Sequence, residues 1–154
     1  GNKVATGENS ITPASFKTKL NKKYFASFSE VQKAQKGKGQ QCLIDARPAA
    51  FFTGDKKHAK ARIPGRLANA RNLQEGNLID DSFKMKSSSA IKSQFGGLDG
   101  IEQYKGYISY CNTGHWAATV WFGLSEIAQI PNVKMYDGGM THWTSNPKRK
   151  VDLG

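Results

Sequence analysis

Cys111 is the residue of this sequence best placed to do chemistry, because it lies between a strand-like and a helix-like segment. Residues 107–110 have the composition of a buried strand, and after Gly114 apolar residues recur at three- and four-residue intervals. Backbone amides at a helix start have no partners within the helix, and the helix dipole adds partial positive charge there. The pattern therefore predicts a site for a thiolate, a persulfide or an oxyanion.

The turn after Cys111 supplies the candidate binding groups of this site. They are expected to act mainly through their backbone amides, since none of the side chains carries a permanent charge. The loop consists of Asn112, Thr113, Gly114, His115, Trp116 and Ala117.

Asp45 and Arg47 are two further candidates, because they follow another apolar segment, residues 42–44. In open α/β sheets ligands bind at the carboxyl ends of the strands. If the two strands are neighbours, Asp45 and Arg47 lie close to Cys111. A salt bridge that anchors the loop is the favoured interpretation of this pair, and direct contact with a ligand is the alternative.

The two cysteines, Cys42 and Cys111, are too few for a disulfide-rich scaffold. A disulfide between them would consume the thiol that the turn presents. The histidines, His58, His115 and His142, show no metal-ligand spacing with either cysteine. The sequence therefore favours a free thiol and predicts neither a metal centre nor a cofactor.

Length and charge suggest one domain that attracts small anions. The chain has 154 residues and a net charge of +11. Its lysines are spread along the sequence without interleaved aromatic residues or a recognition module, which favours a solvated basic surface over a nucleic-acid site. No apolar run approaches the ~20 residues of a membrane span, and residues 1–10 lack the apolar core of a signal peptide. We expect no membrane partner, and a cytoplasmic protein or a periplasmic one whose leader has been removed.

The order of predicted elements indicates an α/β domain with a mostly parallel sheet. Residues 1–13 are polar and read as a linker or tail. Helices are expected from a capping box at Ser27 up to Gly37, around Phe51 and Phe52, from 87–89 through 95, and after Gly114. Strands are expected at 16–20, 42–45, 67–70, 107–110 and 133–137, the last followed by a sharp turn at 138–139.

Several of these pieces together resemble a known family, the rhodanese domain of thiosulfate and mercaptopyruvate sulfurtransferases. The resemblance covers residues 16–151 and is closest to the catalytic C-terminal half of a tandem rhodanese. The matching pieces, in order, are Asp45-Ala46-Arg47, Phe52, Ile63-Pro64-Gly65, Cys111 to Ala117, Tyr136-Asp137-Gly138-Gly139 and Trp143.

The resemblance implies a three-layer α/β/α fold with a five-stranded, mostly parallel sheet in residues 14–154. It leaves open a second rhodanese domain upstream in the natural chain. It also implies a sulfurtransferase in which Cys111 carries a persulfide, without a cofactor, between an anionic donor and an acceptor. Thiosulfate or 3-mercaptopyruvate would be the donor, and cyanide or a thiol the acceptor. The alternative is a sulfur-carrier or protein-interaction module with little turnover alone.

Three positions depart from the family pattern. Arg62 stands where many members have His before Ile-Pro-Gly, and we expect it to support the site. Phe51 stands where many tandem members have an arginine that holds the donor. Trp116 replaces a loop arginine of many single-domain members, and the run from Cys111 to Trp116 is one residue shorter than in related phosphatases. A phosphatase or arsenate reductase is therefore poorly supported, and the choice of sulfur donor stays open.

Overall fold

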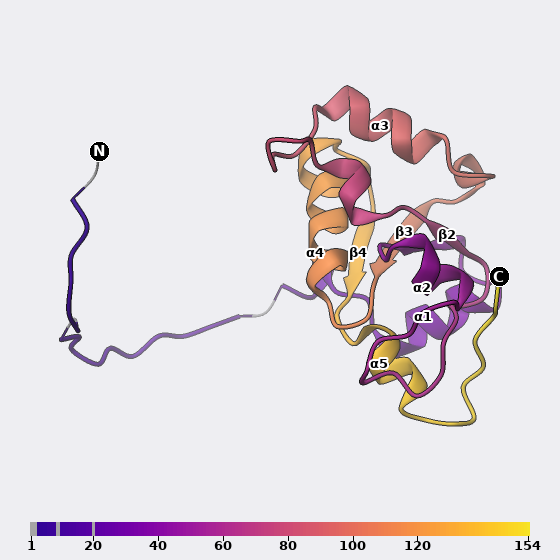
Figure 1. Ribbon diagram of the computed structural model, residues 1–154, viewed down its shortest axis with the longest axis horizontal. Helices are drawn as coiled ribbons and strands as arrows, with labels where there is room; N and C mark the ends of the chain where they lie inside the picture. Colours follow the sequence, from indigo (N-terminus) through magenta and orange to yellow (C-terminus); the bar gives the residue numbers. More distant parts are fainter. Residues whose placement is uncertain (1–2, 9, 20) are drawn as a thin grey trace.

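The computed structural model describes residues 3–8, 10–19 and 21–154, and a parallel four-stranded sheet lies at its centre (Figure 1). The strand order is β2-β1-β3-β4, and every neighbouring pair is parallel. β3 is buried along its whole length, as expected of an inner strand of a parallel sheet. The strands are β1 (Gln41–Asp45), β2 (Ala70–Asn72), β3 (Gly106–Tyr110) and β4 (Val133–Tyr136).

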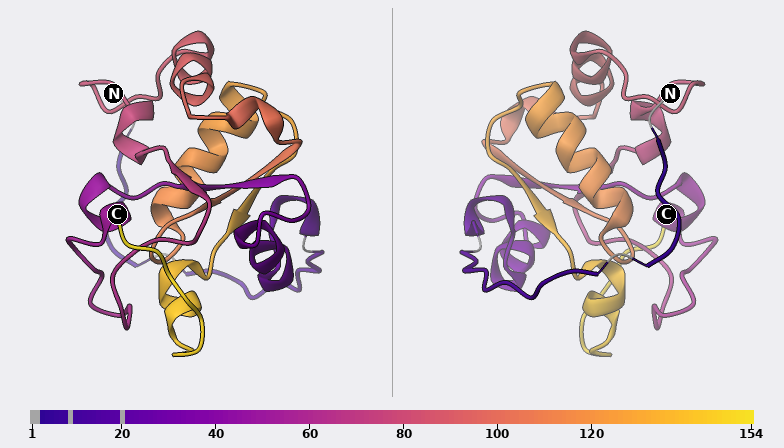
Figure 2. Two further views of the ribbon diagram at one scale, coloured as in Figure 1. Left: turned by 90° about the vertical axis from the view of Figure 1, so that its right-hand side faces the viewer. Right: turned by 90° about the vertical axis from the view of Figure 1, so that its left-hand side faces the viewer.

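Helices cover both faces of the sheet, so the domain has three layers (Figure 2). One face packs on α3 (Ser88–Gly96) and α4 (His115–Phe122), and the other packs on α1 (Phe28–Gln35), α2 (Ala49–Thr53) and α5 (Gly139–Thr144). Successive strand residues point to opposite faces. Cys42 and Ile44 therefore join the first core cluster, and Leu43 joins the second.

The predicted helix starts of α1 and α3 are confirmed by their caps. Ser27 accepts a hydrogen bond from the Glu30 amide, and the Glu30 carboxylate accepts one from the Ser27 amide, which completes the capping box. Ser87 accepts from the Ala90 amide at the start of α3. Shorter helical segments complete the chain: η1 (Lys22–Tyr24), η2 (Glu75–Leu78), η3 (Ile101–Gln103) and η4 (Gly123–Ile127), the last a wider helical turn that continues α4.

The expected five-stranded sheet is wrong, because the described residues form a sheet of four strands. The edge strand expected at residues 16–20 does not form over residues 16–19, and Leu20 lies outside the described residues. Phe16, the first apolar residue of this alternating segment, is 86% exposed and is not packed in the core. Phe25, which follows this segment, forms a single parallel bridge with Met135 of β4.

The third predicted strand was placed three residues too early. Leu67 is buried in the core, but the backbone then takes a left-handed turn at Asn69, and β2 begins only at Ala70. Leu67 therefore fills the core from a loop, and the composition of residues 67–70 alone does not distinguish this arrangement from a short strand.

Residues 3–8 and 10–19 contain no helix or strand, and they are exposed. They run away from the body of the domain in Figure 1. None of the helices in the described part of the chain has the length and apolar character needed to cross a membrane.

Candidate active site

The carboxyl ends of β1 and β3 bring the predicted site residues together. Asp45 lies opposite Tyr110 in the register, and the Ala46 amide donates to the Tyr110 carbonyl at 2.9 Å. Cys111 follows β3 directly, and Arg47 comes two residues after β1 ends. β1 and β3 are therefore neighbours, which is the condition under which the sequence placed Asp45 and Arg47 close to Cys111.

The Cys111 sulfur lies at the start of α4. Its Sγ atom accepts a hydrogen bond from the Gly114 amide at 3.1 Å. Gly114 is the N-cap residue of α4 and has φ +99, a conformation that strongly favours glycine. A Cβ atom there would also lie 3.3 Å from the Asp137 carbonyl oxygen. Glycine thus lets the loop turn tightly enough for a backbone amide to face the sulfur.

A cavity of about 370 Å³ opens beside the sulfur. Cys111 is 1% exposed and lines this cavity, so its side chain borders a confined space and is shielded from bulk solvent. The lining residues are His58, Cys111, Asn112, Thr113, His115 and Trp116. His58, from the loop after α2, was not among the residues predicted for the site, and the basic composition of that loop gave no signal for it.

The first turn of α5 holds the loop that carries Cys111. The Met140 amide donates to the Cys111 carbonyl at 2.9 Å, and the Thr141 amide donates to the Asn112 carbonyl at 3.2 Å. Gly139 has φ +52, and a Cβ atom on it would lie 2.5 Å from the Cys111 carbonyl oxygen. The second glycine of the predicted turn therefore permits a close approach between α5 and the loop.

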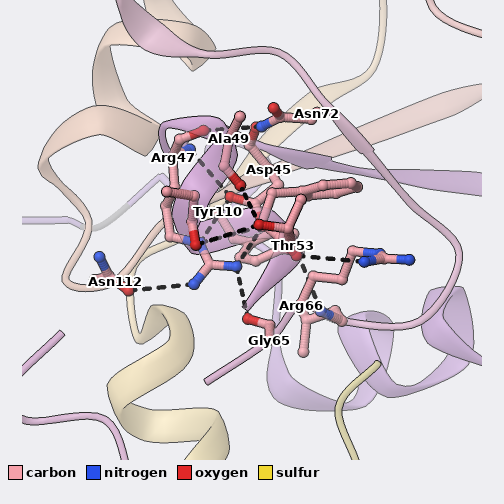
Figure 3. A network of polar contacts seen from close by, with 12 residues as sticks. Asp45, Arg47, Ala49, Thr53, Gly65, Arg66, Asn72, Tyr110 and Asn112 are labelled. Atoms are coloured by element: carbon pink, nitrogen blue, oxygen red, sulfur yellow. Dashed lines mark hydrogen bonds and ion pairs between the residues drawn. The ribbon is translucent and has the colours of Figure 1, made fainter. Parts of the chain in front are cut away.

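Asp45 and Arg47 form the ion pair expected at the edge of the sheet, and both side chains are buried (Figure 3). Arg47 donates to the Asp45 carboxylate at 2.6 Å, to the Gly65 carbonyl at 2.9 Å and to Asn112 Oδ1 at 3.5 Å. Burial alone would lower the pKa of Arg47, but hydrogen bonds and charge from Asp45 outweigh it, and the pKa is raised. A charged Arg47 thus joins the Ile-Pro-Gly turn to the Cys111 loop.

Tyr110 lies under this network and is fully buried. Its hydroxyl oxygen accepts a hydrogen bond from the Leu67 amide at 3.2 Å. Burial raises the pKa of Tyr110 well above its usual value, and the Asp45 carboxylate raises it further. The phenol is therefore neutral and acts as a structural link between β3 and the segment before β2.

The remaining predicted residues differ in how close they come to the sulfur. Thr113 and His115 are exposed at the rim, with Thr113 Oγ1 and His115 Nδ1 3.4 Å apart, and Trp116 forms part of the wall. Ala117 is buried in α4 and packs in the core. Arg62 is exposed and does not line the cavity, although its amide donates to Thr144 Oγ1 at 3.0 Å.

The Trp116 ring is held by Phe51, whose ring centroid lies 6.0 Å away in an edge-to-face arrangement. Phe51 stands where many tandem members of the family that the sequence resembles have arginine, and Trp116 stands where many single-domain members have it. Trp116 lines the cavity and Phe51 packs beside it, so aromatic rings replace positive charge at both positions.

Metal binding has no structural support in the part of the chain that is described. Within residues 3–8, 10–19 and 21–154, no three His, Cys, Asp or Glu side chains lie close enough to hold an ion. The chemistry that the site can offer comes from the Cys111 thiol, backbone amides, the Asn112 amide and imidazole groups.

A model of the rhodanese-like domain matches residues 27–146, which include β1, β3 and the whole site. The chain belongs to the rhodanese-like family. The family assignment agrees with the parallel sheet and with the position of the cysteine at the end of β3.

Curated relatives of this rhodanese-like domain are named as sulfurtransferases. The chain is 31% identical over 114 residues to a protein of Saccharopolyspora erythraea that is provisionally named thiosulfate sulfurtransferase. It is 30% identical over 111 residues to the 3-mercaptopyruvate sulfurtransferase of Escherichia coli K12. These matches cover 70% and 71% of the chain but only 40% and 38% of the relatives. The rhodanese-like domain thus corresponds to less than half of each relative.

Solved structures share the fold at low sequence identity. Tum1 of Saccharomyces cerevisiae has a TM-score of 0.69 at 23% identity, over 84% of this chain and 47% of that one. The anaerobic ergothioneine biosynthesis enzyme of Chlorobium limicola has a TM-score of 0.76 at 19% identity, over 86% and 32%. At these identities the likeness concerns the fold alone.

Proposed function

We propose that this rhodanese-like domain is a sulfurtransferase that carries sulfane sulfur on Cys111. The donor is an anion such as thiosulfate or 3-mercaptopyruvate, and the acceptor is cyanide or a thiol. The observation that carries the proposal is that Cys111 lines a cavity, with the Gly114 amide 3.1 Å from its sulfur at the start of α4. The names of the curated relatives support the same reaction class.

In the first half of the reaction, the Cys111 thiolate attacks the outer sulfur of the donor. With thiosulfate, the new S–S bond forms as the old one breaks, and sulfite leaves with the electron pair. With mercaptopyruvate, a C–S bond breaks and pyruvate leaves as its enolate. The product on the protein is an anionic persulfide, which the amide at the helix start can stabilise without a metal.

In the second half, the acceptor attacks the terminal sulfur of the persulfide. Cyanide takes this sulfur to form thiocyanate, and the S–S bond electrons return to Cys111 as the thiolate. The site needs no general acid in either half, because each leaving group departs as an anion. This agrees with a cavity whose polar groups are mainly amides and imidazoles.

The surrounding contacts keep the loop in one geometry during both halves. Arg47 holds Asn112 and Gly65, and the α5 amides hold the carbonyls of Cys111 and Asn112. Positioning of this kind contributes strongly to enzymatic rates, since small displacements of a nucleophile are costly.

The test is to incubate the protein with thiosulfate or mercaptopyruvate and to analyse its peptides by mass spectrometry. We expect an adduct of about 32 Da, one sulfur atom, on the Cys111 peptide, and its loss with formation of thiocyanate when cyanide is added. Cys111→Ala should abolish both products, and the matched variant Cys42→Ala should retain them. If folded wild-type protein gives no adduct with either of these donors or with polysulfide, the proposal is wrong.

The carrier or interaction module considered from the sequence predicts another outcome. It would acquire the same adduct but transfer sulfur to small acceptors no faster than free cysteine does. The names of the curated relatives do not favour this alternative.

A further inference from the structure

Asn112 has a buried side-chain atom that the reaction described above does not use. The residue is 2% exposed and lines the cavity beside Cys111. Its Nδ2 atom is the one buried side-chain nitrogen or oxygen without a hydrogen-bond partner in the described part of the chain. A buried polar group of this kind is costly and is rare in folded proteins.

The orientation of this amide follows from its neighbour Arg47. A guanidinium group only donates hydrogen bonds, so Asn112 must turn its oxygen toward Arg47. Arg47 Nη1 lies 3.5 Å from Asn112 Oδ1, and Nδ2 lies on the side away from Arg47 in Figure 3. Because Asp45 and Gly65 hold Arg47 in place, the amide cannot flip without leaving the guanidinium unsatisfied on that side.

We propose that Asn112 Nδ2 donates a hydrogen bond to an oxygen atom of the sulfur donor and so selects donors that carry oxygen. Sulfonate, sulfonyl and carboxylate groups supply such an acceptor, whereas inorganic polysulfide does not. This inference rests on the proposed function of Cys111. It adds a specificity-determining residue and makes Arg47 its positioning residue.

In the part of the chain that is described, the other lining groups supply no permanently charged side chain for this task. Among the described residues, no lysine, arginine, aspartate or glutamate side chain lines the cavity. When Cys111 takes the outer sulfur of thiosulfate, sulfite leaves with the electrons of the broken S–S bond, and negative charge grows on its oxygens. A hydrogen-bond donor such as Asn112 Nδ2, placed at those oxygens, stabilises the transition state. The same N–H group finds no oxygen acceptor when the sulfur donor lacks oxygen.

The test compares thiosulfate with inorganic tetrasulfide, two dianions that differ in their oxygen atoms. The rate constant for sulfur addition to Cys111 is measured by mass spectrometry for wild type and Asn112→Ala. We expect the loss of rate in the variant to be about 5- to 150-fold larger with thiosulfate than with tetrasulfide, because only thiosulfate offers oxygen to Nδ2. Asn112→Ser, whose hydroxyl can donate, should regain part of this difference, and the tetrasulfide rate measures any loss that comes from the loop geometry alone.

A second measurement needs no variant. Methanesulfonate carries a sulfonate group but no transferable sulfur, so it should protect wild-type Cys111 from tetrasulfide. Equal losses with both donors in Asn112→Ala would indicate a structural role and overturn the inference, as would unchanged rates or absent protection by methanesulfonate. The proposed function survives each of these outcomes, because it fails only if wild-type Cys111 accepts sulfur from no donor, which would overturn both.

Discussion

The amino edge of the sheet, where the parallel strands begin, and the carboxyl edge, where they end, each lie near a buried cysteine and a cavity. The two edges differ in the chemistry that they can support. Cys42 is the second residue of β1 and Cys111 follows the last residue of β3, and both are 1% exposed. The cavity at the amino edge is the larger, about 550 Å³ against 370 Å³. Its lining includes the first residues of three strands, Gln41, Gly106 and Val133.

Burial and cavity size therefore do not locate the candidate active site. At the amino edge, burial raises the pKa of Cys42 to about 11, although the charge of Arg71 lowers it somewhat. At the carboxyl edge, the Gly114 amide donates to Cys111, and the loops after β1 and β3 meet. The convergence of loops and amides at one edge of a parallel sheet, and not an enclosed thiol by itself, distinguishes the candidate active site.

The largest effect is expected from breaking an ion pair at the carboxyl edge. Arg47 lies 2.6 Å from the Asp45 carboxylate, and Lys134 lies 2.6 Å from the Glu30 carboxylate. The side chains of the first pair are 2% and 0% exposed, and those of the second pair are 28% and 30% exposed. Arg47→Ala leaves the Asp45 charge buried and should cost about 3–5 kcal/mol of unfolding free energy. Lys134→Ala should cost about 1 kcal/mol or less. Urea unfolding of the two variants measures this difference, and equal losses would contradict the contrast between the edges.

The next effect concerns two glycines with left-handed backbones, one at each edge. A Cβ atom on Gly139 would lie 2.5 Å from the Cys111 carbonyl oxygen, whereas one on Gly39, beside the larger cavity, would meet nothing within 4 Å. Gly39→Ala should cost about 1–2 kcal/mol from backbone strain alone. Gly139→Ala should cost about 3 kcal/mol and also reduce sulfur transfer, since the loop must shift. Thermal unfolding and thiocyanate formation, measured on both variants, test this; unimpaired transfer in Gly139→Ala would show that α5 does not position Cys111.

A smaller effect comes from the ionisation of Cys42. Its pKa in the folded protein is about 11 against a usual value of 9.0. The Cys42 thiol therefore stays protonated to a higher pH in the folded state than in the unfolded state. The stability that it contributes is fully present below pH 9 and is lost as the pH rises through 11. The loss attributable to Cys42 is about 2.7 kcal/mol. It is measured as the difference in unfolding free energy between wild type and Cys42→Ala across this range; parallel curves would mean that Cys42 titrates normally.

Much of this fold was predictable because its signals are local. The capping box at Ser27, the apolar run of β1 and the spacing of apolar residues after Gly114 each depend on a few neighbouring residues, and all are found in the structure. The strand expected at 16–20 and the early start of β2 were wrong because alternation and apolar composition do not reveal whether a partner is near. Phe16 packs on nothing, and Leu67 packs from a loop.

The candidate site was predictable where it follows the strand ends and not where distant segments meet. The turn after Cys111 and the Asp45–Arg47 pair were visible as strand-end motifs. The approach of Gly139 to the loop, and the unpaired Asn112 Nδ2 atom, depend on packing between segments far apart in the chain. His58 comes from a loop with no periodic pattern, so only the folded arrangement brings it to the cavity.

The smallest predicted effect is a difference in kcat/KM between variants of two basic residues near the carboxyl edge. His58 lines the cavity, and its Nδ1 atom accepts a hydrogen bond from the Lys60 amide at 3.2 Å, so the neutral ring carries its proton on Nε2. Arg62 is exposed and lies outside the cavity lining. His58→Ala should lower kcat/KM for thiosulfate about fivefold, the value of one hydrogen bond, and Arg62→Ala should leave it within about twofold. His58→Gln, which keeps a side-chain donor, should retain part of the rate. A larger loss in Arg62→Ala than in His58→Ala would show that the exposed arginine acts on the donor before it enters the cavity.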